Sequence, residues 1–293
     1  PVFGGTKMFR RRGGARYLKS LNPYDKVLAH IMTRRSDAQV FFTDDIDCKY
    51  LDEYLAEKAA EGIEMSYMDI VNAALVRIYA LRPALNRFVM NSRIFANEDI
   101  KISMAVKKAL RDDATSTTIK LSFTGHESIY DVQNRFKEEI AKNKGHESVN
   151  STDRLMRALM SGPHIIIKVL IWLIKLADRW NMLPKSIIDA SPFHGSVFIT
   201  YLKSLGIRGI YHHIYDFGTI GLFIGLGKEK RIPVIDRESG EIRPGKLLEL
   251  MVVADERLCD GLYHAKSMRM LRKMIENPRL LEERLEQVAA DIA

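Results

Sequence analysis

The chain has 293 residues, of which 46% are hydrophobic and 28% are charged. These are ordinary values for a globular protein with a substantial core. The formal net charge is +8, and residues 1–35 account for all of it, with nine Lys or Arg and one acid. Because the rest of the chain is neutral overall, a basic groove across the fold is excluded, and we expect no nucleic-acid partner.

The two cysteines, Cys48 and Cys259, are too few for a disulfide framework and favour a reducing cytoplasm. No apolar run follows the basic N-terminal residues, so no secretory signal is expected. Cys259 follows the strand predicted over residues 247–254, which indicates a small core residue rather than a nucleophile.

Residues 1–24, rich in Gly and Arg, are predicted to form a basic arm that precedes a domain over residues 25–293. Hydrophobic periodicity and capping residues predict helices over 49–61, 67–81 and 128–143 and strands over 40–46, 88–90, 100–105 and 117–123. Further strands are expected over 196–201, 220–226 and 247–254, with a hairpin turn at 238–240 and a C-terminal helix over 263–290. This mixture predicts an α/β or α+β fold with one large sheet.

Residues 165–177 form the most apolar segment, with eleven apolar residues in thirteen, interrupted by Lys168 and Lys175. The segment is shorter than the roughly 20 residues that a bilayer-spanning helix needs. We expect a helix over 163–181 that is buried or lies at an interface. The alternative is a helix on a membrane surface, which Trp172, Trp180 and Arg179 favour.

Charged residues lie where the apolar strand over 247–254 meets the last helix, in the run Asp255-Glu256-Arg257-Leu258-Cys259-Asp260-Gly261. On its own, this run predicts a salt-bridged turn with Asp260 as a helix N-cap. The run also resembles the Asp-His-Arg-x-x-Asp-Gly signature of dihydrolipoamide acyltransferases, the acyltransferase components of 2-oxo acid dehydrogenase complexes. Further matches are Glu276-Asn277-Pro278-Arg279-Leu280-Leu281, residues 65–71, residues 82–86 and residues 199–202.

The resemblance covers roughly residues 25–285 and extends to chloramphenicol acetyltransferase. It implies a single domain with a large mixed β-sheet flanked by helices. It also implies a homotrimer, with cages built from trimers in some relatives, and active sites in channels between subunits. The co-substrate is expected to be an acyl thioester such as acyl-CoA, with no bound cofactor. The residues before the domain contain no Asp-Lys-Ala lipoyl motif, so no swinging arm is expected in this chain.

The signature histidine, which is the family's general base, is replaced by Glu256. An ordinary glutamate has a pKa about 4 units below that of a thiol, so proton transfer to it costs roughly 5–6 kcal/mol, against about 3 kcal/mol for imidazole. Desolvation in a channel can close this gap. Glu256 is therefore one candidate base, and Asp255, Arg257, Asp260 and Gly261 are expected to support its loop.

The run Tyr211-His212-His213-Ile214-Tyr215-Asp216 holds a second set of candidates. The resemblance places the family's oxyanion hydroxyl near here, where Tyr211 is the available hydroxyl. His212 or His213 can replace the missing base, with Asp216 orienting one of them. The alternative is that both histidines pack at a subunit contact. Two adjacent histidines without a third ligand indicate no metal site.

Three functions follow. The first is an acyltransferase that uses an acyl thioester and an unknown acceptor. The second is a catalytically silent trimeric or cage-forming scaffold. The third is a module that binds an anionic membrane or an acidic partner through residues 1–35 and 165–177, which would make a cytoplasmic protein peripheral at a membrane. An amphipathic helix over 282–293 makes the family's usual cage contact doubtful.

Overall fold

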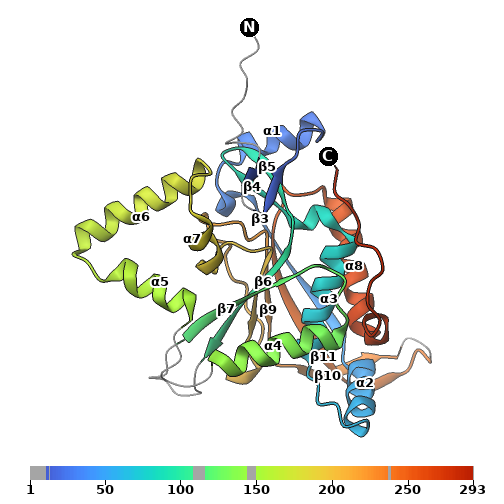
Figure 1. Cartoon of the computed structure of the whole chain (residues 1–293). Helices are drawn as coiled ribbons and strands as arrows, with labels where there is room; N and C mark the ends of the chain where they lie inside the picture. The colour runs from blue at the N-terminus through green and yellow to red at the C-terminus, as the bar shows by residue number, and fades with distance from the viewer. Residues whose placement is uncertain (1–10, 13, 108–115, 144–149, 237–238, 293) are drawn as a thin grey trace.

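A computed structural model describes residues 11–12, 14–107, 116–143, 150–236 and 239–292. Its centre is a mixed sheet (Figure 1) that contains β3 (Gln39–Asp47), β6 (Ile100–Lys107), β7 (Ser116–Phe123), β8 (Val197–Tyr201), β9 (Leu222–Leu226), β10 (Lys230–Ile235) and β11 (Ile242–Asp255). The order is β10-β11-β9-β8-β6-β7, and β3 also pairs with β11. The β6–β8 and β8–β9 pairs are parallel and the others antiparallel. The predicted large mixed sheet is therefore confirmed.

One face of the sheet carries the main core, against which α2 (Lys49–Ala60), α3 (Tyr67–Leu81), α4 (Ile129–Asn143) and α8 (Gly261–Glu276) pack. The central helix is α3, which is buried along nearly its whole length. Its bounds match the prediction, because Asp69 accepts a hydrogen bond from the Ser66 backbone N–H at its start and Pro83 follows its end.

Part of the opposite face, over β8, β9 and β11, is covered by a segment without regular structure, residues 207–219, which we call the histidine loop. Ile214 of this loop packs with Phe198, Ile220, Phe223 and Val253 from the sheet face and its edge. The loop lies so close to β9 that a Cβ on Gly227 would fall 1.9 Å from the Gly209 nitrogen. Glycine at this position thus permits the close contact between loop and sheet.

A second sheet, of order β1-β2-β5-β4 in the described residues, lies beside α1 (Pro23–Ile31) and consists of β1 (Arg11–Arg12), β2 (Ala15–Tyr17), β5 (Arg93–Asn97) and β4 (Arg87–Met90). Leu18 and Leu21 are buried with Ile94 and Ala96. Their burial removes apolar side chains from water, so residues 14–24 belong with the domain rather than with a separate arm. Residues 1–10 and 13 of the predicted arm lie outside the described residues.

The C-terminal helix predicted to reach residue 290 is wrong. Helix α8 ends at Glu276, because Pro278 disfavours helical backbone at the residue before it. A short 3-10 helix, η5 (Pro278–Leu281), follows, and residues 282–292 then run without regular structure. Leu285 and Ala289 donate backbone hydrogen bonds to His126 and Ala80, which fastens this tail to the domain.

The segment between β7 and β8 contains α5 (Ser151–Met160), α6 (His164–Arg179) and α7 (Lys185–Ala190). Helices α5 and α6 form a hairpin that extends away from the sheets (Figure 1). A buried position for the apolar segment over 165–177 is wrong for this protomer, since α6 buries only Ile167 and Asp178. In the described residues, no helix is both long and apolar enough to span a membrane.

Candidate functional site

The signature run, residues 255–261, forms the junction between β11 and α8, and we call it the motif loop. A buried ion-pair network fixes its start. Arg257 donates two hydrogen bonds to the Asp255 carboxylate, of 2.8 Å from Nε and 2.6 Å from Nη2. The Arg35 Nε lies 3.5 Å from the same carboxylate, and all three side chains are buried. One carboxylate therefore compensates two guanidinium groups.

Glu256 follows this network and is exposed in the protomer. Its backbone N–H donates a 3.0 Å hydrogen bond to Ala38. The loop backbone is thus fixed while the carboxylate faces solvent. At the end of the loop, the Asp260 carboxylate accepts a hydrogen bond from the Tyr263 N–H and caps α8, which begins at Gly261.

Cys259, between these two positions, is half-buried, and burial raises the pKa of its thiol to about 12. A thiol that stays protonated at neutral pH is a poor nucleophile. Its position agrees with the predicted packing role, because it contacts the main core.

A short 3-10 helix, η2 (Arg35–Ala38), joins the motif loop to the histidine loop. Arg35 donates to the Tyr215 carbonyl over 2.7 Å and to the Gly218 carbonyl over 2.9 Å. The Gln39 amide donates to the Ile214 carbonyl over 3.1 Å. Since Arg35 also pairs with Asp255, one buried guanidinium holds both candidate loops at the same end of the sheet.

Asp216 pairs with residues of η2 and its N-terminal flank in this protomer. Its carboxylate accepts a 3.0 Å hydrogen bond from the Ser36 N–H and lies 3.5 Å from Arg34 Nε. These donors and the Arg35 backbone hold the pKa of the carboxyl below its usual value. Asp216 therefore anchors the histidine loop to η2, and its partners among the described residues are Ser36, Arg34 and the Arg35 backbone.

His212 lies against the sheet, with its Nε2 3.1 Å from the Thr200 hydroxyl and its ring stacked on Phe223 at 4.6 Å. Burial, and to a lesser degree the charge of His213, lower the pKa of His212 from its ordinary value. His212 is consequently neutral at pH 7 and able to accept a proton.

Thr200 is the residue that sequence analysis missed. It lies within the matched stretch over residues 199–202, and the twofold periodicity of a strand turns it away from the core side of Ile199. A hydroxyl in the otherwise apolar run of β8 was the available signal. Its hydrogen-bond partner His212 lies 12 residues further along the chain, and this contact is recognisable only from the path of the loop.

The other two candidates face outward. The Tyr211 hydroxyl hydrogen-bonds to the Thr43 hydroxyl over 2.7 Å, and the Tyr211 ring packs edge-on against Phe41 at 5.6 Å. His213 is exposed and contacts the Tyr215 ring. The hydroxyl that hydrogen-bonds to His212 is thus that of Thr200, while that of Tyr211 bonds to Thr43.

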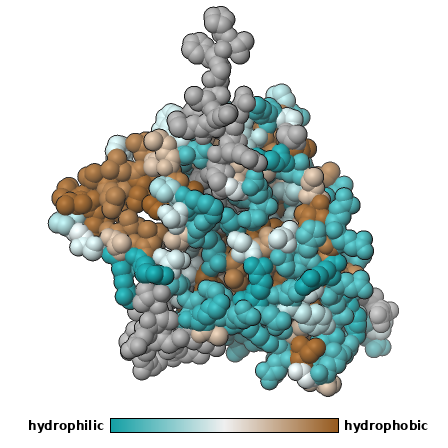
Figure 2. Space-filling model, viewed as in Figure 1, coloured by the Kyte–Doolittle hydropathy of each residue, from teal (hydrophilic) through white to brown (hydrophobic). Residues whose placement is uncertain are grey.

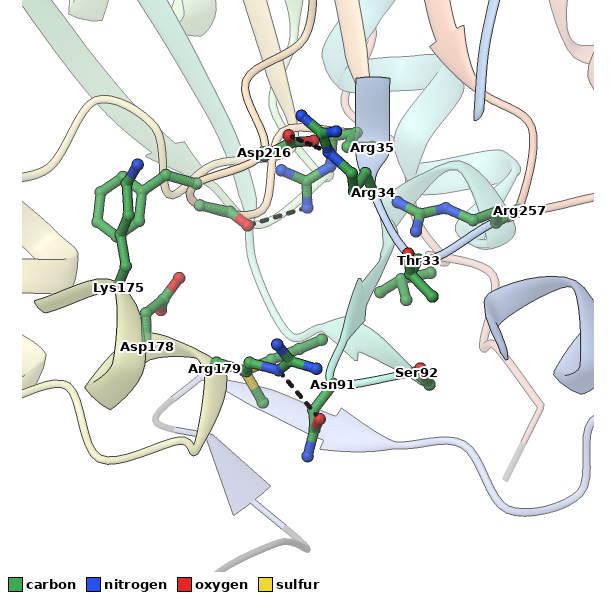
Figure 3. A pocket seen from close by; sticks show the side chains of 14 residues that line it. Thr33, Arg34, Arg35, Asn91, Ser92, Lys175, Asp178, Arg179, Asp216 and Arg257 are labelled. Atoms are coloured by element: carbon green, nitrogen blue, oxygen red, sulfur yellow. Dashed lines mark hydrogen bonds and ion pairs between the residues drawn. The ribbon is translucent and has the colours of Figure 1, made fainter. Parts of the chain in front are cut away.

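A cavity of about 390 Å³ lies beside the motif loop, between the C-terminal end of α6, the β4–β5 turn and η2 (Figure 3). Five basic side chains line it, namely Arg34, Arg35, Lys175, Arg179 and Arg257, against the acids Asp178 and Asp216. The turn is shaped by Asn91 and Ser92, which both have positive φ angles, and the Asn91 side chain accepts a 3.3 Å hydrogen bond from Arg179 Nε.

This excess of cations suits an anionic group such as a phosphate. The lining residues come from distant parts of the chain, so the cavity was not predictable from sequence. Among the described residues, no three His, Cys, Asp or Glu side chains are grouped in a way that suits a metal ion.

No protein-family model and no curated protein matches the chain in sequence. Solved structures do match. A probable dihydrolipoamide acetyltransferase from Listeria monocytogenes is 16% identical, with a TM-score of 0.56 over 88% of this chain and 93% of that one. The Azotobacter vinelandii dihydrolipoamide acetyltransferase is 14% identical, with a TM-score of 0.55 over 90% and 93%. Chloramphenicol acetyltransferase is 10% identical, with a TM-score of 0.53 over 90% and 98%.

The chain therefore has the chloramphenicol-acetyltransferase-like fold. Within that fold it is similar to the catalytic cores of dihydrolipoamide acetyltransferases, as the motif run had indicated. The identities are low, so these likenesses establish architecture, and the chemistry has to be argued from this chain's own residues.

Proposed function

We propose that the protein is an acyltransferase that takes its acyl group from a phosphate-bearing thioester, acyl-CoA. The observation that carries this proposal is the basic cavity bordered by Arg257 of the motif loop and by Asp216 and Gly218 of the histidine loop. An acyl-CoA is a polyanion joined to a thioester. The cations suit its phosphates, and the two neighbouring loops, which hold the candidate bases, suit the reaction at its thioester.

His212 is the proposed general base. The ring is neutral at pH 7, and its Nε2 is within hydrogen-bond reach of Thr200. With Nε2–H donating to the Thr200 hydroxyl, Nδ1 is the unprotonated nitrogen that accepts a proton from the attacking acceptor. Thr200 is then a positioning residue, because its hydrogen bond orients the imidazole ring. The tautomer is part of the proposal, since a hydroxyl can donate to Nε2 or accept from it.

Glu256 is the alternative base, since it occupies the signature histidine's position on a rigid loop. In the Azotobacter enzyme, a histidine and an asparagine four residues apart are among the residues investigated for a catalytic role. Glu256 and Asp260 have the same spacing. An exposed carboxylate is a weak base toward a thiol, so this role requires a neighbouring subunit to desolvate Glu256.

The proposed active form is an oligomer, with a trimer as the first candidate. One relative of this fold forms the cubic core of a pyruvate dehydrogenase complex. In this chain, exposed apolar side chains surround the histidine loop: Phe41, Ile207, Ile210 and Tyr211 are 43–53% exposed. A subunit that covers this patch would remove it from water and would enclose His212 and His213.

The experiment measures release of CoA from acetyl-CoA and longer acyl-CoAs with thiol, amine and alcohol acceptors. We expect turnover in the wild type, at least a hundred-fold lower kcat in His212→Gln, and unchanged turnover in the matched control His30→Gln, whose imidazole is exposed on α1. Retained turnover in His212→Gln together with its loss in Glu256→Gln would transfer the base to Glu256. CoA binding without turnover for any acceptor would overturn the enzyme proposal and favour the silent scaffold.

A further inference from the structure

The outer surface of α6 is the largest apolar feature on the face of the molecule shown in Figure 2, where the α5–α6 hairpin forms a continuous hydrophobic projection. Its apolar side chains are exposed along the whole helix: Ile165 (69%), Ile166 (56%), Val169 (52%), Trp172 (61%), Leu173 (47%), Leu176 (39%) and Trp180 (44%). A contiguous apolar surface of this kind marks an interaction site rather than scattered surface residues.

The spacing of residues divides α6 into three faces. Ile165, Val169, Leu176 and Trp180 recur at helical intervals and form the middle of the outward apolar face. Ile167 and Asp178 form the inward face and are buried.

Between these faces lies a cationic edge, because Lys168, Lys175 and Arg179 are separated by seven and four residues. Trp172 lies next to this edge on the wheel. An apolar face flanked by Lys, Arg and Trp is the pattern of a helix that lies in the plane of a membrane interface.

The hairpin is held in a defined orientation. The Asp178 carboxylate, near the end of α6, lies 3.1 Å from His194 Nε2, and His194 Nδ1 lies 2.8 Å from the Ser191 hydroxyl. At the start of α5, the Asp153 carboxylate accepts a 2.8 Å hydrogen bond from Thr117 of β7. Both acids of the two helices are thereby turned toward the protein body.

The exposed charge of the hairpin is consequently positive, from Arg154 and Arg157 on α5 and Lys168 on α6, while Lys175 and Arg179 on the same edge also line the cavity. We propose that the α5–α6 hairpin docks on the surface of an anionic lipid bilayer, with the apolar face of α6 inserted below the headgroups. The sixteen residues of α6 span only about 24 Å, which suits a helix lying in the interface rather than crossing it. Positive charge beside the apolar face favours anionic over neutral lipid.

Tryptophan fluorescence tests this directly, because the chain has two tryptophans, of which Trp172 lies on α6 and Trp180 caps its C-terminal end. We expect vesicles of phosphatidylserine and phosphatidylcholine to shift the emission to shorter wavelength and to carry the protein upward in a density gradient. Pure phosphatidylcholine vesicles should bind at least ten-fold less protein. Added salt should weaken binding to the anionic vesicles.

The variant pair Val169→Ser with Leu173→Ser should lower the vesicle-bound fraction at least ten-fold, and Lys168→Glu should lower it several-fold. The matched control is Ile235→Ser with Ile242→Ser, which changes two apolar side chains that are 67% and 76% exposed on the β10–β11 hairpin; its binding should equal that of the wild type. Equal binding of Val169→Ser with Leu173→Ser and wild type would overturn the proposal. Absence of vesicle binding by the wild type would also overturn it. If Val169→Ser with Leu173→Ser then lost the oligomer, α6 would be assigned to a contact with a second copy of the chain. Acyl transfer in detergent-free solution is measured separately, so failure here leaves the enzymatic proposal standing.

Discussion

Replacing Asp255 by alanine should destabilise the protein more than any other single change in the motif loop. Asp255 is 3% exposed, and its carboxylate accepts both hydrogen bonds from Arg257 while pairing with Arg35. Burial lowers the pKa of Arg35, and Asp255 opposes that shift. Without the carboxylate, the two buried guanidinium groups lose their nearest compensating charge.

Removing one partner of a buried ion pair costs about 3–5 kcal/mol, because the remaining charge stays desolvated. Arg35 and Arg257 keep their hydrogen bonds to backbone carbonyls, which places Asp255→Ala within that range rather than above it. For a chain of this size, roughly 2–3 °C of melting temperature corresponds to each kcal/mol, so we expect a decrease of about 6–15 °C.

The assay is thermal unfolding followed by circular dichroism. The matched control is Glu256→Ala, one residue further along the same loop, which removes an exposed carboxylate and should change stability by less than about 0.5 kcal/mol. If Asp255→Ala and Glu256→Ala melted at the same temperature, the reasoning that one buried carboxylate holds both loops together would be refuted.

Three further predictions concern the chemistry. The pKa of His212 is lowered and its neutral form is the proposed base, so activity should be full at pH 7 and should fall as pH decreases through a midpoint below 6.5. His213→Gln should raise that midpoint, since the charge of His213 contributes to the shift. An unmoved midpoint would contradict the assignment of His212 as the base. Lys175→Ala and Arg179→Ala should each raise KM for acyl-CoA about ten-fold with little change in kcat, because each removes a cation from the cavity. The control is Lys185→Ala, which removes an exposed lysine paired with Asp189. An equal KM in all three variants would contradict binding of acyl-CoA in the cavity. Glu256→His should raise transfer to a thiol acceptor, and no gain in an oligomer whose channel is open would count against Glu256 as a site residue.

Local signals predicted most of the regular structure. Helix α3 has its predicted bounds because a capping residue and a proline mark its two ends. The turn between β10 and β11 was recognisable from Gly240, which has a positive φ angle. The apolar spacing beyond residue 281 is also that of a helix, but Pro278 interrupts helical backbone, and the spacing instead lets Leu285 and Val288 pack partly buried against the core.

The site was only partly predictable, because its parts are joined by tertiary contacts. The charged run of the motif loop is visible in the sequence. Its ion pair between Asp255 and Arg35 is not, because the two residues are 220 positions apart in the chain. The pairing of His212 with Thr200 required knowledge of how the histidine loop lies on β8 and β9. Similarly, an apolar helix is ordinarily buried, and only the path of the chain between β7 and β8 shows that α6 projects from the domain.

The most direct test of the central claim is the structure of the native oligomer with bound CoA. We predict that CoA phosphates lie within hydrogen-bond distance of Lys175 and Arg179 in the cavity, and that the CoA sulfur approaches a His212 imidazole of the same or an adjacent subunit. CoA bound elsewhere, or bound in the cavity with its sulfur directed away from both His212 and Glu256, would contradict the account.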